Sequence, residues 1–169
     1  ETDGQFVTCW LEWVDLAGAE PVAGAKEFLD HAASNGVEVF YVSNRPEGQR
    51  EATVENLLSV GFPCADDDHV YLRQAEASKE SRRQTVAEEY EIVLLLGDNL
   101  NDFSDVFEDQ LVPDRAAAVD SLEDEFGTRF IVLPNPFYGD WEDAVYEYAG
   151  GLSDDEEASL RMDALEGYK

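Results

Sequence analysis

Cations are scarce in this sequence of 169 residues: 11 lysines and arginines stand against 39 aspartates and glutamates, a net charge of −28. A nucleic-acid-binding protein needs the opposite balance, because it must neutralise phosphates. Long apolar runs are also missing. The longest, Ile92–Gly97, falls far short of the ~20 residues that a transmembrane helix requires. We therefore expect no nucleic-acid partner and no transmembrane segment.

The acidic residues are spread along segments that also carry apolar positions, so they do not form a disordered acidic tail. Hydrophobic residues make up 44% of the chain, which is enough to fill the core of one compact domain. The pattern favours adaptation to high salt over an ordinary acidic protein, because molar salt screens repulsion among carboxylates. Two cysteines, Cys9 and Cys64, could pair or stay free, and the sequence does not decide between these states.

Strand and helix patterns alternate along the chain. Apolar runs of strand length occupy Val37–Ser43, His69–Leu72, Ile92–Leu96 and Phe130–Leu133. Helices are predicted at Pro21–Asn35, Gln49–Val60, Lys79–Tyr90, Asp114–Phe126 and from the Ser153-Asp-Asp-Glu156 capping box to about Leu165.

This order predicts a doubly wound parallel α/β sheet flanked by helices, with Ile92–Leu96 buried on both faces. Gly150-Gly151 divides the chain into a main domain, residues 1–150, and a C-terminal helix, residues 151–169.

Two carboxylates follow the most apolar strand pattern. Asp98 comes directly after Gly97, and Asp102 lies four residues further on. Ligands bind at the carboxyl ends of strands in such sheets, and carboxylate oxygens suit Mg²⁺. Asp98 could instead cap the following helix, and the spacing alone does not decide between these roles.

Another polar group, Ser43-Asn44-Arg45, ends the strand Val37–Ser43. Its hydroxyl and backbone N–H groups could bind phosphate oxygens, although a simple turn would also explain it.

Lys79 and Arg82 form a local positively charged group in this acidic chain. They could offset phosphate charge, or they could mark a solvated helix start.

Aromatic residues outside the predicted strands include Trp10, Trp13, Tyr138 and Trp141. They are either part of a peripheral core or a platform for a flat group. His31 and His69 receive no role.

Taken together, these strings resemble the class C acid phosphatases, the bacterial lipoprotein e (P4) family of the haloacid dehalogenase (HAD) superfamily. The resemblance is carried above all by the segments Phe40–Arg45 and Gly97–Phe103, and further by Trp10–Val14, Ile131–Asn135 and Tyr138–Glu142. It implies a HAD-like Rossmannoid fold with a small helical, aromatic cap.

The resemblance implies residue roles in Mg²⁺-assisted phosphoryl transfer. Ser43, Asn44 and Arg45 would form the phosphate-binding loop, and Lys79 would pair with the phosphate and the nucleophile. Asp98 would bind Mg²⁺, while Asp102 would hold metal-bound water. Trp10 and Tyr138 match the positions at which the family stacks the base or ring of its substrate.

The sequence departs from the family in one respect, because no Asp-x-Asp-x-Thr motif follows a hydrophobic strand. In the family this motif provides the nucleophilic aspartate and the general acid. It lies a short way upstream of the segment that matches Trp10–Val14, so we expect it before Glu1.

The preferred hypothesis is a Mg²⁺-dependent phosphomonoesterase that hydrolyses small, nucleotide-like phosphate esters through an aspartyl-phosphate. Family analogy places it outside the cytoplasm, as a secreted protein or cell-surface lipoprotein, and an assembly of identical chains is compatible with the sequence. One alternative is a non-catalytic relative, a storage or binding protein that has lost the nucleophile. Another is a phosphatase or phosphotransferase for a different substrate, such as a sugar phosphate.

Overall fold

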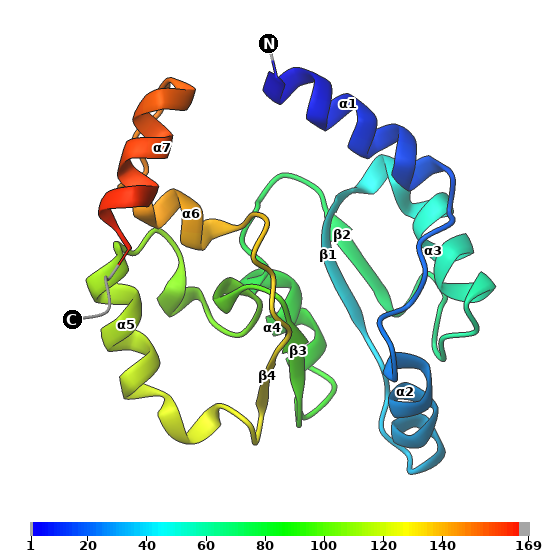
Figure 1. Ribbon diagram of the computed structural model, residues 1–169. Helices are drawn as coiled ribbons and strands as arrows, with labels where there is room; N and C mark the ends of the chain where they lie inside the picture. Colours follow the sequence, from blue (N-terminus) through cyan, green and yellow to red (C-terminus); the bar gives the residue numbers. More distant parts are fainter. Residues whose placement is uncertain (1, 166–169) are drawn as a thin grey trace. The chain divides into compact units, whose positions relative to one another are not determined.

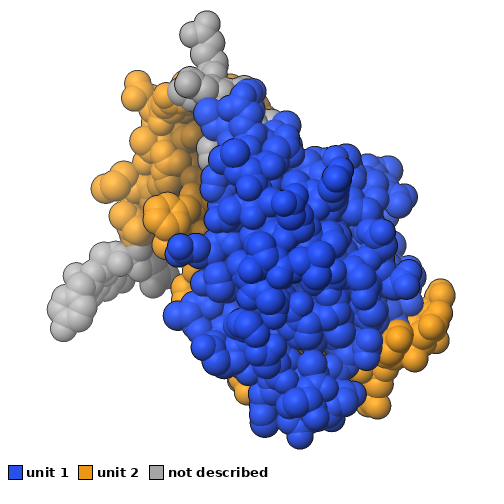
Figure 2. All heavy atoms as spheres, turned by 90° about the vertical axis from the view of Figure 1, so that its right-hand side faces the viewer, with its two compact units in different colours: residues 1–86 blue, residues 87–169 orange. Residues whose placement is uncertain are grey.

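The computed structural model describes residues 2–165 of the chain. The chain forms two compact units, Glu1–Val86 and Ala87–Lys169, which are coloured separately in Figure 2. Each unit contains a pair of parallel strands and several helices (Figure 1). The α/β class and the parallel strands are therefore confirmed, and the hydrogen bonding divides the observed strands into two pairs.

The first unit is built around strands β1 (Tyr41–Pro46) and β2 (Val70–Arg73), which are joined by helix α3 (Arg50–Ser59). A helix between two parallel strands is the usual crossover connection. The unit also contains α1 (Thr2–Asp15), α2 (Ala25–Ser34), the 3-10 turn η1 (Glu47–Gln49) and most of α4 (Glu80–Ala87).

Buried polar side chains attach α1 and the segment after it to the α3 region. The amide of Asn56 accepts a hydrogen bond from the backbone N–H of Ala19 at 3.1 Å and donates to its carbonyl at 2.9 Å. Gln49 donates to the Leu11 carbonyl at 3.0 Å and to Asp15 at 2.9 Å. Because both amides are buried, these bonds fix how the two helices pack (Figure 1).

The second unit pairs β3 (Leu95–Gly97) with β4 (Phe130–Val132) in a parallel register that places Gly97 opposite Val132. Its core is a cluster of phenylalanines, Phe103, Phe107 and Phe130, in which Phe107 is fully buried. The other elements are α5 (Val112–Ser121), α6 (Asp140–Val145), α7 (Asp154–Asp163) and the 3-10 turns η2 (Leu100–Asp102), η3 (Asp105–Phe107) and η4 (Glu123–Glu125).

Most predicted elements are present with shorter bounds. The predicted Ser153–Glu156 capping box is confirmed by both of its hydrogen bonds. Helix α2 starts only at Ala25, because Gly24 before it has a left-handed backbone with φ 82°. The helix predicted from Lys79 ends at Ala87, and the one predicted to reach Phe126 ends at Ser121.

Two expectations need correction. The segment that carries Trp10 and Trp13 is helical (α1), although no helix was predicted there. The prediction that Ile92–Leu96 is buried on both faces is wrong, since Leu96 is 44% exposed. Leu95 packs on the phenylalanine cluster, and strand alternation turns Leu96 to the opposite face.

The division of the chain at Gly150 stays a prediction, and residues 166–169 of the predicted C-terminal segment lie outside the described residues. Among the helices that the structure describes, none combines the length and apolarity that crossing a bilayer requires.

Candidate active site

The predicted phosphate-binding residues Ser43, Asn44 and Arg45 lie inside β1 rather than after it. Val42 pairs with Tyr71 and Pro46 with Arg73, so three residues of β1 stand opposite one residue of β2. Such an irregularity bends a strand and changes where its side chains point. The Ser43 hydroxyl accepts a hydrogen bond from the Arg45 backbone N–H at 3.2 Å, which stabilises the bend.

Arg82 connects this bend to the start of α4. Its guanidinium donates to the Ser43 carbonyl at 2.6 Å, to Asn44 Oδ1 at 2.7 Å and to the Ser78 carbonyl at 2.8 Å. The backbone just before Lys79 is thereby brought beside the Ser43–Asn44 bend. Arg82, which was considered as a cation for phosphate, holds two backbone segments together.

Lys79 is half-buried and directly precedes α4, where its carbonyl accepts from the Arg83 N–H at 3.0 Å. Arg45 donates to Thr53 at 3.3 Å, and its guanidinium lies 6.0 Å from the centre of the Trp13 ring. Trp13 in turn lies 5.2 Å from the ring of Trp10. The first unit thus joins the predicted stacking residue Trp10 to the Ser43–Arg45 bend through Trp13.

In the second unit, Asp102 builds the turn that presents Asp98. Asp102 Oδ2 accepts hydrogen bonds from the backbone N–H groups of Asp98 and Asn99, both at 3.0 Å. This requires a glycine at position 97, because a Cβ there would lie 2.3 Å from the Cβ of Asp102. The glycine permits the close approach, and the carboxylate fixes the backbone of Asp98.

The Asp98 side chain is exposed and held by Asn135, whose amide donates to Asp98 Oδ2 at 2.8 Å. Asn135 follows β4, the strand paired with β3, so the parallel register brings the two residues together. Asp98 Oδ1 makes no hydrogen bond to any residue that the structure describes. An exposed carboxylate with one oriented oxygen suits a hard cation such as Mg²⁺, so these residues fit the predicted metal.

A buried arginine, Arg115, supports the same turn. It is 5% exposed and pairs with Asp140, and it donates to the Asn101 side chain at 3.1 Å and to the Phe107 carbonyl at 2.5 Å. Tyr148 donates to Asp140 at 3.0 Å. The sequence patterns did not single out Arg115, and the one signal was an arginine directly before the small, apolar run Ala116–Val119.

Tyr138, the other predicted stacking residue, is 50% exposed, and its carbonyl accepts from the Trp141 indole N–H at 3.2 Å. It belongs to the second unit, whereas Trp10 belongs to the first. The predicted residues therefore form two groups. Ser43, Asn44, Arg45, Lys79 and Trp10 lie in the first unit, and Asp98, Asp102 and Tyr138 lie in the second.

Residues 4–141 match the family model of the HAD superfamily, subfamily IIIB (acid phosphatase). The chain belongs to this family. It therefore has a HAD-like fold, as the sequence resemblance implied.

The chain is also similar to solved structures of an acid phosphatase. The class C acid phosphatase from Bacillus anthracis is 42% identical, with a TM-score of 0.89 over 95% of this chain and 67% of that one. A second structure of that enzyme, with tungstate bound, gives the same identity and TM-score and covers 68% of that chain.

A curated relative, "Acid phosphatase 1" of Solanum lycopersicum, is 27% identical over 135 residues. The match covers 75% of this chain and 45% of that protein, so the chain spans less than half the length of this relative.

Proposed function

We propose that the protein is a Mg²⁺-dependent phosphomonoesterase that acts on small phosphate esters such as 5′-nucleotides. The observation that carries this proposal is the geometry of Asp98. It follows a parallel strand, its backbone is fixed by Asp102, and its side chain is oriented by Asn135. A carboxylate held in this way is suited to a metal ion, and the chain belongs to the acid phosphatase subfamily IIIB of the HAD superfamily.

In this proposal the Asp98 side chain is the metal ligand among the residues that the structure describes. Bound Mg²⁺ supplies charge neutralisation for the phosphoryl group during transfer. Asp102 holds the backbone of Asp98 in place and would orient water at this site. The other residues predicted for the site bind the substrate itself.

Ser43 and the backbone around Asn44 and Arg45 bind phosphoryl oxygens, and Lys79 offsets their charge. Arg82 supports this arrangement, because it joins the Ser43–Asn44 bend to the residues before Lys79. Trp10 and Tyr138 stack on the organic part of the substrate. At a net charge of −28, local cations reduce the repulsion that an approaching anion meets.

The relative solved with tungstate adds support. Tungstate is a tetrahedral oxyanion of the same shape as phosphate, and we propose that this chain binds such anions as well. A competitive effect of tungstate on hydrolysis would link the phosphate-binding residues to the reaction.

The nucleophile is proposed to be an aspartate of an Asp-x-Asp-x-Thr motif upstream of Glu1, since the 169 residues contain no such motif. The aspartate attacks phosphorus and the ester oxygen leaves with a proton from the second aspartate. Water activated by that residue then releases phosphate. Sequencing the gene immediately before the Glu1 codon tests this step: a hydrophobic strand pattern ending in the motif supports it.

A substrate panel with the natural full-length protein tests the function. We expect Mg²⁺-dependent release of phosphate from nucleoside 5′-monophosphates and p-nitrophenyl phosphate, inhibited by tungstate. Faster hydrolysis of a sugar phosphate than of a nucleotide would change the proposed substrate class. Absence of any hydrolysis would refute the proposal that the protein is an enzyme.

We further propose that the protein works outside the cytoplasm, by family analogy, and in high salt, because of its charge.

A further inference from the structure

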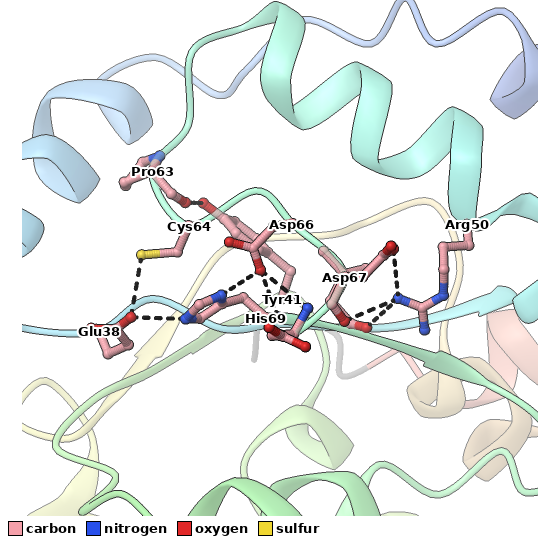
Figure 3. Close-up of polar contacts among 10 residues, drawn as sticks. Glu38, Tyr41, Arg50, Pro63, Cys64, Asp66, Asp67 and His69 are labelled. Carbon is pink, nitrogen blue, oxygen red and sulfur yellow. Dashed lines mark hydrogen bonds and ion pairs between the residues drawn. The ribbon is translucent and has the colours of Figure 1, made fainter.

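A cluster of metal-ligating side chains lies in the first unit at the amino ends of its strands, whereas Ser43–Arg45 lie toward the carboxyl end of β1. It consists of Glu38, Cys64 and His69, whose ligand atoms all lie within 4.8 Å of one another (Figure 3). His69 Nε2 is 2.8 Å from Glu38 Oε1, and Cys64 Sγ is 3.9 Å from the same oxygen. Three different ligand types therefore converge on one point.

A fourth residue, Asp66, orients the imidazole from behind. Its Oδ1 lies 2.6 Å from His69 Nδ1 and also accepts the backbone N–H groups of Asp68 at 3.1 Å and His69 at 3.2 Å. The other ring nitrogen, Nε2, donates to Glu38 while the imidazole is protonated, and loss of this proton leaves an Nε2 lone pair that points toward Glu38 and Cys64. A carboxylate behind the histidine is the usual support of a metal-binding imidazole in proteins.

The loop that carries Cys64 is anchored on both sides, as Figure 3 shows. The Tyr41 hydroxyl donates to the Pro63 carbonyl at 2.5 Å, directly before Cys64. On the far side, Arg50 donates to the Asp67 carbonyl at 3.4 Å. Cys64 itself has a left-handed backbone with φ 54°, which is uncommon for a residue with a side chain. The thiol is thus presented to Glu38 by a defined loop conformation.

We propose that Glu38, Cys64 and His69 bind a divalent transition-metal ion of the zinc type, with Asp66 as the positioning carboxylate and water as the fourth ligand. Tetrahedral bonds of about 2.0–2.3 Å place neighbouring ligand atoms roughly 3.3–3.8 Å apart, so the cluster needs to adjust by only about 1 Å. Thiolate and imidazole ligands select such an ion over Mg²⁺. This site is therefore chemically distinct from the one proposed at Asp98.

Metal binding would connect the segment before β1, which carries Glu38, to the loop between α3 and β2, which carries Cys64 and His69. An ion that binds only the folded chain stabilises it in proportion to its affinity and concentration. The water ligand and the 44% exposed side chain of Glu38 keep the ion accessible from solvent. The role that follows is stabilisation of this end of the first unit.

Cobalt titration of the metal-stripped, full-length protein tests the proposal, because a cobalt–thiolate bond absorbs in the near ultraviolet and carboxylates alone do not. Molar KCl suppresses unspecific binding to the acidic surface. Burial lowers the pKa of His69, but its hydrogen bonds to Asp66 and Glu38 outweigh burial and raise it above 6.5. The titration is therefore repeated at increasing alkaline pH, which favours loss of the Nε2 proton.

We expect the thiolate band to saturate at one Co²⁺ per chain and to disappear when Zn²⁺ is added. Cys64→Ser should abolish the band, whereas Cys9→Ser, at an exposed cysteine in α1, should leave it unchanged. Asp66→Asn should weaken Co²⁺ binding about 10- to 100-fold. Asp67→Asn, its exposed neighbour, is the matched control and should have little effect.

Absence of the band in the unmodified protein, or its persistence in Cys64→Ser, would overturn the proposal. Circular dichroism of each variant separates loss of the site from loss of the fold. The readout involves no phosphatase activity, so its result is independent of the function proposed above.

Discussion

Replacing Arg115 with methionine should destabilise the second unit strongly. The guanidinium is buried with Asp140, whose side chain is 17% exposed, and it also donates to Asn101 and to the Phe107 carbonyl. The substitution leaves a carboxylate without its counter-charge, and breaking a buried pair in this way costs about 3–5 kcal/mol. For a chain of this size, each kcal/mol lowers Tm by roughly 2–4 °C, so we expect a fall of about 6–20 °C.

The matched control is Arg129→Met, in the same unit. Arg129 is 49% exposed and lies 3.9 Å from Glu125, so losing this surface pair should cost less than about 1 kcal/mol. Thermal unfolding followed by circular dichroism in molar KCl measures both variants. Adding Asp140→Asn to Arg115→Met should recover part of the loss, because it removes the unpaired charge. Equal Tm values for Arg115→Met and Arg129→Met would refute the reasoning.

Three further predictions concern the turn, the pH dependence and the charge. Gly97→Ala should cost about 1–3 kcal/mol through its clash with Asp102, while Gly150→Ala, in open space, should be nearly neutral in the same urea unfolding assay. Burial and the hydrogen bond to Asp140 raise the pKa of Tyr148 from 10.0 to about 12. The neutral phenol therefore stabilises the fold below pH 10, and this contribution is lost as the pH rises through about 12. Tyr148→Phe should flatten that alkaline decline in Tm; an unchanged decline would contradict the assignment. Raising KCl from about 0.1 to 1 M shortens the Debye length from ~10 to ~3 Å and should raise Tm, whereas a constant or falling Tm would argue against salt adaptation.

Short-range sequence patterns predicted much of the local secondary structure. The strand before Asp98 and the capping box at Ser153 were both recognisable, because strand runs and caps depend on neighbouring residues. Helix α1 escaped prediction, since Gly4, Val7 and Thr8 are weak helix formers. The burial of Ile92–Leu96 was overestimated, because an apolar run does not reveal which faces of its strand are covered.

Contacts between distant residues could not be predicted. Asn135 reaches Asp98 only through the β3–β4 register, and Arg115 pairs with Asp140 across 25 positions of sequence. The histidine to which the sequence assigned no role, His69, meets Glu38 from 31 positions away. In each case the partner is determined by how strands and loops pair, and a single sequence does not contain that register.

The most direct measurement of the central claim is the rate of p-nitrophenyl phosphate hydrolysis by the natural full-length protein as Mg²⁺ is titrated. Asp98→Asn should abolish the Mg²⁺-dependent rate, because it removes the proposed metal ligand while the Asn135 contact can persist. Asp105→Asn, an exposed carboxylate in the neighbouring turn, should retain it. Undiminished Mg²⁺-dependent hydrolysis by Asp98→Asn would contradict the account.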